Sequence, residues 1–252
     1  ILIIGATSAI SRSVSRLYAA ENMRLCLLGR DEKRLNEAAA DLRIRGAGAV
    51  ETLTYNAEKT NEHSMVIDSA IEFLGSIDIA LICHGQLPSQ KDCQENYEKA
   101  EAAIRVNGLS VISLCTQIVN QLRIQKEGLL AVITSVAGER GRQSNFIYGA
   151  AKSMVSTYLE GLRGSLLNDN IHVVDVRPGL VDSPMTSKFK KGPLWSSPES
   201  IAAAIFQGID KKKHTIYAPF YWRFIMLFVC IIPEFIFKRI RSENRRWTIK
   251  NV

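Results

Sequence analysis

The sequence predicts a single α/β domain built on a doubly wound parallel β-sheet of about seven strands, with helices on both faces. Short apolar runs alternate with longer amphipathic stretches along most of the 252 residues, as strands joined by helical crossovers do. The apolar runs are also continuous, which favours strands that are buried on both faces. We find no internal repeat and no low-complexity linker, so a single domain accounts for this pattern.

The elements follow one another in a regular order. We expect strands at 1–4, 24–28, 50–55, 77–83, 129–134, 171–176 and, more briefly, 215–218. We expect helices near 9–21, 31–45, 60–74, 94–126 and 146–168, with a weaker one at 198–209. Ligands of such sheets bind beyond the carboxyl ends of the strands, so functional side chains are expected in the segments that follow them.

Charge separates the body of the chain from its end. The net charge is +7, and residues 211–252 hold ten Lys or Arg against two Glu, which is +8 and leaves −1 for residues 1–210. The basic end adjoins an apolar segment and the body is neutral, so we expect no nucleic-acid binding. The five cysteines form no close pair, which indicates buried, reduced thiols, and the four histidines lack ligand spacing, so no metal site is expected.

The turn after the first strand is typical of phosphate binding. Gly5 permits a tight bend, and the small residues up to Ser11 let the backbone approach a pyrophosphate at a helix N-terminus. This predicts a Rossmann-like sheet in which Gly5, Thr7, Ser8 and Ile10 bind a dinucleotide. An ordinary turn between a strand and a helix is the alternative.

The end of the second strand indicates which dinucleotide is bound. An acidic residue there would bind the ribose 2′-hydroxyl of NAD(H), but Gly29 stands at this place and Arg30 follows it. The Arg30 guanidinium, assisted by Arg12, suits a 2′-phosphate, whereas a solvated arginine at a helix start is the alternative. The sequence therefore favours NADP(H) and leaves NAD(H) open.

Three side chains suit carbonyl chemistry. Ser135 ends an apolar run, and Tyr148 and Lys152 stand four residues apart in a predicted helix, so both project from one face. A hydroxyl holds a carbonyl, a phenol gives or takes a proton, and a nearby ammonium makes the phenol more acidic than its usual pKa near ~10. The Tyr-x-x-x-Lys spacing also arises on solvated helices, so its surroundings decide the interpretation.

These surroundings resemble the short-chain dehydrogenase/reductase family over nearly the whole chain. The matching pieces, in order, are the Gly5 turn, Asn107 in Val-Asn-Gly, Ser135, Tyr148-x-x-x-Lys152, and Arg177-Pro-Gly-Leu-Val-Asp-Ser183. Their order and spacing together make the resemblance specific. It implies a cofactor-dependent oxidoreductase that acts on a ketone or an alcohol.

The resemblance assigns a role to each catalytic residue. It implies that Ser135 and Tyr148 bind the substrate carbonyl and that Tyr148 is the acid or base. Lys152 would hold the nicotinamide ribose and lower the pKa of Tyr148, and Asn107 would stabilise a water chain behind it. Pro178, Gly179, Val181 and Ser183 match the segment that seats the nicotinamide amide.

Three segments depart from the family pattern. Ala9 and Ser11 stand where turn glycines are usual, Asn56 replaces the acidic residue that holds adenine, and Ile82-Cys83-His84-Gly85 replaces Asn-Asn-Ala-Gly. Cofactor contacts are still implied for Asn56, Ala57, Cys83 and Gly85. For His84, a hydrogen-bonded structural role is favoured over a proton relay.

A narrower resemblance lies in 135–149, in Pro219, and in the Phe-Ile-Phe-Lys stretch that ends at Lys238. These pieces are similar to decaprenylphosphoryl-2-keto-pentose reductases. The similarity implies NAD(P)H-dependent reduction of a polyprenylphosphoryl 2-keto-pentose, the second step in converting a polyprenylphosphoryl ribose to the arabinose precursor of cell-wall arabinan. An FAD-dependent oxidase would be the pathway partner, and the family implies a homodimer or homotetramer. Arg140 and Arg142 would face a sugar phosphate or solvent.

The end of the chain predicts a membrane-associating segment. Residues 220–237 are almost entirely apolar. A transmembrane helix needs about 20 uninterrupted apolar residues, and Arg223, Pro233 and Glu234 interrupt this segment. Lys238, Arg239, Arg241, Arg245 and Arg246 follow, which suits a segment in the interface of an anionic membrane. We expect a domain at 1–218, a tail at 219–252, and peripheral attachment at the cytoplasmic face. A helix buried in a dimer or covering the active site is the alternative.

Two other functions stay open. One is reduction of a different lipid ketone, of the long-chain 3-oxoacyl or sterol type, by the same chemistry. The other is a membrane-docked scaffold without turnover, which the altered glycine turn and the Cys83-His84 pair would suit. The complete set of Ser135, Tyr148, Lys152 and Asn107 favours an enzyme.

Overall fold

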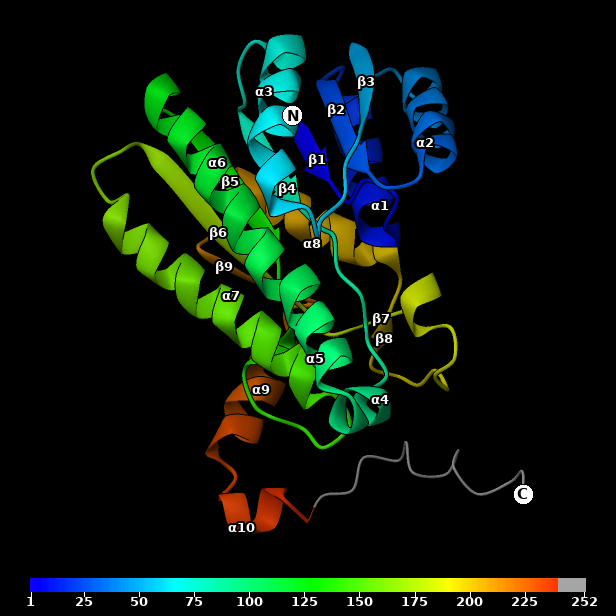
Figure 1. The fold of residues 1–252 in the computed structure, drawn as a ribbon, viewed down its shortest axis with the longest axis vertical. Coiled ribbons are helices and arrows are strands. Elements are labelled where there is room, and N and C mark those ends of the chain that lie inside the picture. Colours follow the sequence, from blue (N-terminus) through cyan, green and yellow to red (C-terminus); the bar gives the residue numbers. More distant parts are fainter. Residues whose placement is uncertain (240–252) are drawn as a thin grey trace.

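The computed structural model, which describes residues 1–239, contains one sheet of seven parallel strands in the order β3-β2-β1-β4-β5-β6-β9 (Figure 1). The strands are β1 (Leu2–Ile4), β2 (Arg24–Gly29), β3 (Ala49–Thr54), β4 (Ile79–Ile82), β5 (Gly128–Ile133), β6 (Ile171–Pro178) and β9 (Thr215–Ala218). The strand order reverses between β1 and β4, so a ligand crevice is expected beyond their carboxyl ends. The predicted doubly wound parallel sheet is confirmed.

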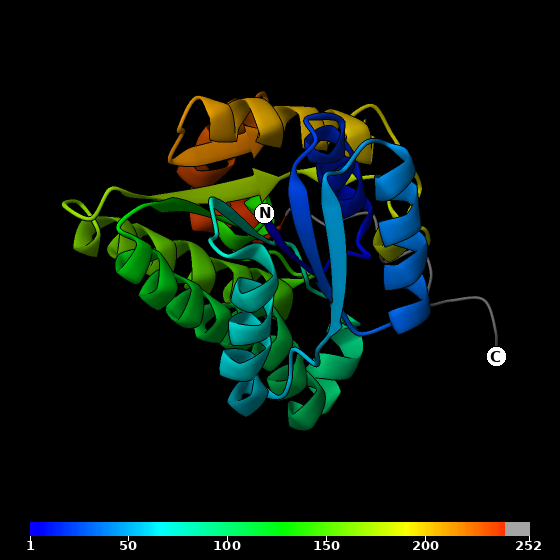
Figure 2. The same ribbon diagram turned by 90° about the horizontal axis from the view of Figure 1, so that it is seen from above.

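Two layers of helices cover the sheet (Figure 2). One face carries α1 (Ala9–Ala20), α2 (Glu32–Ile44) and α8 (Pro198–Asp210), and the other carries α3 (His63–Leu74), α6 (Ser110–Gln125) and α7 (Phe146–Ser165). Successive residues of a strand point to opposite faces: in β1, Ile3 enters one apolar cluster while Leu2 and Ile4 enter the other. Burial of both faces explains why the strands are apolar throughout.

The long helix expected at 94–126 is interrupted. The segment consists of α4 (Gln90–Glu95), α5 (Tyr97–Ile104), a π-helical turn at Arg105–Leu109, and then α6. Asn96 separates α4 from α5 because its backbone is extended and its side chain caps α5. Widened turns of the π type are rare and frequently occur at functional sites, and this one contains Asn107.

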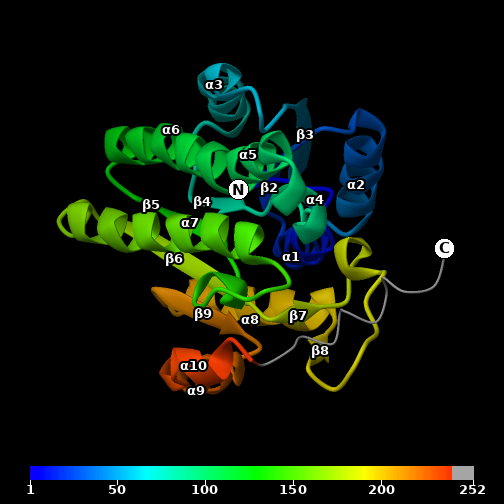
Figure 3. The same cartoon turned by 60° about the horizontal axis from the view of Figure 1, so that its bottom comes forward.

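Several short elements gather at the carboxyl edge of the sheet. After β6 the chain forms a small two-stranded sheet from β7 (Leu180–Val181) and β8 (Trp195–Ser196), which the sequence did not predict. After β9 it forms α9 (Trp222–Ile231), which contacts β9, and α10 (Glu234–Phe237), which lies beyond α9 (Figure 1 and Figure 3). The division of the chain at residue 218 stays a prediction, and the basic residues expected at 241, 245 and 246 lie outside the described residues.

The inner side of α9 anchors it to the rest of the molecule. Trp222 and Met226, one helical turn apart, are buried and pack with Val136 and Tyr217. A Cβ on Gly179 would lie 1.8 Å from the indole nitrogen of Trp222, so the indole ring rests directly on the segment that follows β6. The first part of the predicted tail is thus packed against the region where the nicotinamide was expected.

Candidate active site

The predicted trio converges at the carboxyl end of β5. Ser135 lies two residues after the end of β5 and begins a short 3-10 turn that lies against α7. α7 carries Tyr148 and Lys152 one helical turn apart. The turn and the helix approach closely because Gly149 has no side chain: a Cβ there would lie 2.7 Å from the carbonyl oxygen of Ala137. This close approach of two backbones brings the hydroxyl, the phenol and the amine to one place.

Lys152 is buried in this site. Its ammonium donates a hydrogen bond of 2.9 Å to the carbonyl oxygen of Ile133, and only 3% of the residue is exposed. Burial disfavours the charged form and lowers the pKa of Lys152 to about 8, although the negative charge of Asp175 opposes this shift. The amine therefore stays largely protonated at neutral pH and loses its proton in the mildly alkaline range.

The surroundings of Tyr148 make its phenol less acidic, which is the reverse of the sequence expectation. Burial raises the pKa of Tyr148 to about 12, and the neighbouring Ser135 hydroxyl only partly opposes this shift. The Lys152 ammonium lies 5.9 Å from the centre of the Tyr148 ring and is bonded to Ile133. The expectation of a more acidic phenol is therefore wrong for this structure. A phenol that is protonated at neutral pH is suited to donate a proton.

Asn107 is fully buried and fixes the segment that follows β4. Its side-chain oxygen accepts a hydrogen bond of 2.9 Å from the Gln86 backbone N–H, and its side-chain nitrogen donates one of 2.9 Å to the Ala103 carbonyl. A Cβ on Gly85 would lie 2.9 Å from the same oxygen, so the residue there has to be small. The water chain expected beside Asn107 stays a prediction. Gln86 was missed because a backbone contact leaves no signal in the sequence.

The turn after β1 has the shape expected for phosphate binding. Gly5 has φ +79°, and a Cβ there would lie 2.5 Å from the His84 backbone nitrogen, so only glycine fits. The Ser8 hydroxyl caps α1 by accepting a 3.1 Å hydrogen bond from the Ser11 N–H, and it lies 3.0 Å from the buried Cys83 sulfur. Cys83 thus supports the turn from behind. Two other predicted cofactor residues, Thr7 and Ile10, lie half-buried in the same segment.

His84 has the contacts of a structural histidine. Its Nε2 lies 2.8 Å from the Ser110 hydroxyl oxygen, and Ser110 donates a 2.7 Å hydrogen bond to the Val106 carbonyl. Burial, together with the positive charge of Lys152, lowers the pKa of His84 to about 3, so the ring is neutral at physiological pH. This agrees with the structural role that the sequence favoured.

The adenosine end of the expected site is basic. Arg30 is exposed directly after β2. The carboxylate of Asp31 is occupied, because it caps α2 by accepting a 3.0 Å hydrogen bond from the Arg34 N–H. The guanidinium of Arg34, which sequence reasoning missed, donates to the Thr7 carbonyl at 3.4 Å and so reaches the glycine turn. Two guanidinium groups can bind a 2′-phosphate here, whereas the nearby carboxylate already caps a helix and is not free to bind a ribose 2′-hydroxyl, so the site favours NADP(H).

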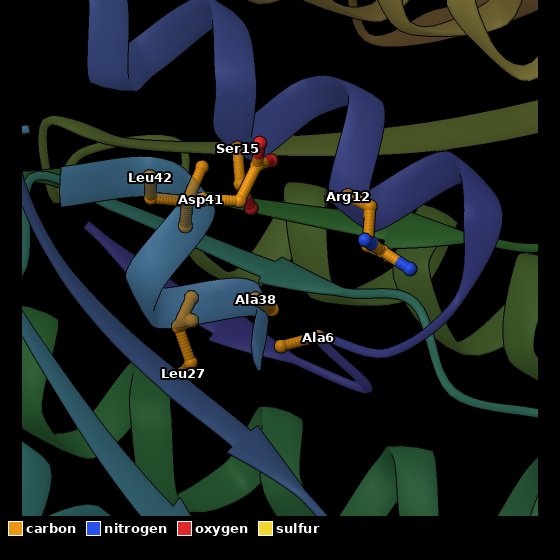
Figure 4. Close-up of a pocket in the computed structure, with 7 residues that line it drawn as sticks. All are labelled: Ala6, Arg12, Ser15, Leu27, Ala38, Asp41 and Leu42. Carbon is orange, nitrogen blue, oxygen red and sulfur yellow. The ribbon is translucent and has the colours of Figure 1, made fainter. Parts of the chain in front are cut away.

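Two further residues expected near the cofactor have local structural partners. The side-chain oxygen of Asn56 accepts a 3.0 Å hydrogen bond from the Glu58 N–H, which leaves its nitrogen to meet an adenine, and Ala57 is buried. Arg12 lines a separate gap between α1 and α2, together with Asp41 (Figure 4). Its volume is about 10 Å³, which is room for one water molecule, so it is a packing gap and not a ligand site.

The segment expected to seat the nicotinamide is held by hydrogen bonds of its own. Pro178 ends β6, and the Gly179 N–H donates a 3.0 Å hydrogen bond to the end of β9. The Thr186 hydroxyl donates to the Val181 carbonyl at 2.6 Å and accepts from the Ser183 N–H at 3.1 Å. Thr186 was missed, although its spacing from Ser183 is that of a capping box.

A network of buried and half-buried charges lies behind the loop that joins β5 to α7. Arg177 in β6 pairs with the fully buried Asp175 at 2.7 Å and with Glu139 at 3.6 Å. Asp175 also accepts a hydrogen bond from the Thr134 hydroxyl at the start of the loop, and Tyr217 in β9 donates one of 2.9 Å to Glu139. The network therefore ties this loop, which carries the predicted catalytic serine and which we call the catalytic loop, to two strands of the sheet.

The arginines of this loop hold the C-terminal helices. Arg140 donates to carbonyl oxygens at the end of α9, among them that of Val229, and its guanidinium lies 4.0 Å from the centre of the Phe237 ring. A guanidinium nitrogen of Arg142 lies 3.3 Å from the Met226 sulfur. Both side chains are half-buried and contact the C-terminal helices, a role that the sequence did not predict, and the sugar-phosphate contact stays a prediction.

The arrangement fits a nicotinamide dinucleotide in an extended conformation. The basic adenosine end follows β2, and the glycine turn with the N-terminus of α1, which favours an anion, follows β1. Lys152 and Tyr148 lie beyond these, next to the end of β5. Since β2, β1, β4 and β5 are neighbours in the sheet, these places lie in one line along its edge. Lys152 would hold the ribose of the nicotinamide.

The chain matches the family model described as short chain dehydrogenase over residues 1–193. It is 29% identical over 240 residues to an uncharacterized oxidoreductase of Mycobacterium tuberculosis, a match that covers 95% of this chain and 96% of the relative. An uncharacterized oxidoreductase of Streptomyces coelicolor is also 29% identical, over 95% of each chain. A third, from Staphylococcus saprophyticus, is 26% identical over 84% of this chain and 92% of the relative.

Two solved structures have a similar fold. One is a variant of the actinorhodin polyketide ketoreductase with NADPH, with a TM-score of 0.74 and 20% identity over 82% of this chain and 88% of the other. The other is an alcohol dehydrogenase of the archaeon Thermococcus sibiricus complexed with 5-hydroxy-NADP, with a TM-score of 0.76 and 21% identity over 86% of this chain and 94% of the other. At these identities the likeness concerns the fold alone.

Proposed function

Because the chain belongs to the short-chain dehydrogenase family and is an NAD(P)-dependent oxidoreductase, we propose that it reduces the keto group of a polyprenylphosphoryl 2-keto-pentose. This reduction is the second step of an epimerisation of polyprenylphosphoryl ribose to the arabinose form, in which an FAD-dependent oxidase supplies the ketone. The observation that carries the proposal is the convergence of Ser135, Tyr148 and Lys152 beside the apolar helices α9 and α10. A homodimer or homotetramer remains an expectation from the family.

The residues of the trio divide the work of a ketone reduction. A bound NADPH would supply the hydride to the keto carbon. The Ser135 hydroxyl donates a hydrogen bond to the keto oxygen and polarises the carbonyl. Tyr148 gives its proton to the same oxygen, and its raised pKa of about 12 keeps it protonated until then. The buried ammonium of Lys152, 5.9 Å from the centre of the Tyr148 ring, would favour the phenolate that remains until solvent returns a proton.

NADPH is the cofactor that the residues favour. Arg30 and Arg34 supply two cations after β2, where a 2′-phosphate would lie, and Asp31 is turned into its own helix cap. The structural neighbours are consistent with this choice, since one was solved with NADPH and the other with an NADP analogue. NADH remains the second choice.

Two observations support a lipid-linked sugar as the substrate. The segment 135–149 resembles reductases of polyprenylphosphoryl keto-pentoses. In addition, α9 and α10 carry exposed apolar side chains and are joined by hydrogen bonds to the loop between Ser135 and Tyr148, so a polyprenyl chain could be met there. A sugar reductase for a soluble substrate has no need of such a surface.

A substrate comparison tests the proposal. The purified chain is given NADPH and a polyprenylphosphoryl 2-keto-pentose made in place by the FAD-dependent oxidase, and both NADPH absorbance and the arabinose product are followed. We expect turnover of the keto sugar and none of a 3-oxoacyl thioester or a steroid ketone. Turnover of only the thioester or the steroid would establish the other lipid-ketone function. No change of nicotinamide fluorescence on adding protein would indicate a scaffold.

A further inference from the structure

The C-terminal helices present an apolar surface to solvent. Of the sixteen large hydrophobic residues that are exposed in the described part of the chain, seven lie between residues 220 and 236. They form what we call the α9–α10 face: Phe220, Phe224, Leu227, Phe228, Ile231, Phe235 and Ile236. Exposed apolar residues on soluble proteins are normally scattered, so this concentration indicates an interaction surface.

α9 is apolar on both of its sides. Trp222 and Met226 fill the inner side and are buried. Phe224, Leu227, Phe228 and Ile231 recur on the outer side at spacings of three and four residues, and Phe224 and Phe228 are 63% and 70% exposed. A helix that is apolar on two opposite sides is normally covered on both of them. Within residues 1–239, the outer side of α9 is therefore left exposed, although its composition is that of a covered surface.

The face is too short to cross a bilayer and suits one that lies on its surface. The ten residues of α9 extend about 15 Å, which is half of the ~30 Å hydrocarbon layer. Among the described residues, the helical stretch 97–125 is long and apolar enough for a span, but 56% of its most apolar window is buried inside the protein, as in a core helix. A membrane contact of this chain would therefore be made by α9 and α10 from one side.

The charges around the face favour an anionic partner. Between residues 219 and 239 the chain has three cations, Arg223, Lys238 and Arg239, all of them exposed, against one acid, Glu234. Cations beside an apolar helix attract the headgroups of anionic lipids. Two copies that met face to face would instead bring these like charges together.

We propose that the α9–α10 face docks on the surface of an anionic lipid bilayer. The docked helices would lie next to the catalytic loop, because Arg140 binds the end of α9 and the Gln143 side chain donates a 2.7 Å hydrogen bond to the Lys238 carbonyl. Docking thus brings the loop between Ser135 and Tyr148 to the lipid phase. The use of this position to collect a lipid-linked substrate rests on the function proposed above, whereas the docking itself does not.

Vesicle sedimentation with the full chain tests the docking. The probes are sucrose-loaded vesicles of phosphatidylcholine, with and without phosphatidylglycerol, at low and high salt. The test variant is the double substitution Phe224→Ser/Phe228→Ser, and the matched control is Ile44→Ser/Leu167→Ser, whose two sites are 88% and 83% exposed elsewhere on the molecule. NADPH binding by fluorescence reports that each variant is folded.

The expected result is specific to the face and to the lipid charge. The wild-type chain and the control should partition onto vesicles with phosphatidylglycerol, and Phe224→Ser/Phe228→Ser should partition at least about 10-fold more weakly. Salt should weaken binding to the anionic vesicles. Equal binding by both double variants, or none by the wild type, would overturn the proposal. So would self-association that is lost in Phe224→Ser/Phe228→Ser, since a second copy would then cover the face. Docking by a chain that reduces no keto sugar would refute only the proposed substrate.

Discussion

Replacing Gly149 by alanine tests whether close backbone contact positions the catalytic loop. In an open helix this substitution stabilises a protein by about 0.5–1 kcal/mol. Here the new methyl group would lie 2.7 Å from the Ala137 carbonyl oxygen, which is 0.7 Å inside the 3.4 Å at which ordinary contact begins (3.4 − 2.7). Neither backbone can yield without moving Ser135 away from α7. We expect overpacking to cost about 2 kcal/mol and turnover to fall on the order of 10-fold.

Gly161→Ala in the same helix is the matched control. No heavy atom lies within 4 Å of the position that its Cβ would take, so it should gain about 0.5–1 kcal/mol and keep full turnover. Urea unfolding and kcat/KM for ketone reduction, measured on both variants, separate the two effects. The reasoning is refuted if Gly149→Ala is as stable and as active as Gly161→Ala.

Three other predictions concern charged groups. Arg177→Met should lower the free energy of unfolding by about 3 kcal/mol, because it leaves the carboxylate of the buried Asp175 without its cation. The control Arg105→Met, which removes an exposed ion pair with Glu101, should lower it by under about 1 kcal/mol. Similar urea midpoints for the two variants would contradict this prediction. The double variant Arg30→Ala/Arg34→Ala should raise the KM for NADPH by about 10-fold or more and leave the KM for NADH nearly unchanged, because only NADPH carries the 2′-phosphate. An equal rise for both cofactors would argue against the 2′-phosphate site. The kcat/KM for reduction should fall as pH rises through about 8, because Lys152 loses its proton there. The free energy of unfolding should instead rise above this pH, because the lysine keeps its proton to higher pH in the unfolded chain than in the folded one. A rate that stays constant up to pH ~10 would refute this pH dependence.

The sheet and the convergence of Ser135, Tyr148 and Lys152 were predictable because each leaves a local pattern. Strands buried on both faces have to be apolar at every position, and the alternation with amphipathic stretches then gives the crossovers. Tyr148 and Lys152 share a helical face by their spacing alone. Ser135 could be placed because it ends an apolar run, and the carboxyl ends of neighbouring strands meet at one edge.

The features that sequence reasoning missed depend on contacts between distant segments. The apolar pattern continues through the π-helical turn, so the position of Asn107 within it was invisible. Arg140 and Arg142 were expected to meet phosphate or water because nothing nearby in the sequence shows that α9 folds back onto their loop. The direction of the Tyr148 pKa shift was also wrong, since burial outweighs a cation that lies 5.9 Å from the ring centre.

Single-turnover kinetics of Tyr148→Phe test the central claim that the Tyr148 phenol delivers the proton to the reduced carbonyl. The substitution removes one oxygen atom and leaves the ring in the half-buried site beside Ser135. NADPH binding, measured by fluorescence, should stay within about 3-fold of the wild type, while the rate of ketone reduction should fall by roughly 10²–10⁴-fold. Reduction at the normal rate by a variant that binds NADPH normally would contradict the account.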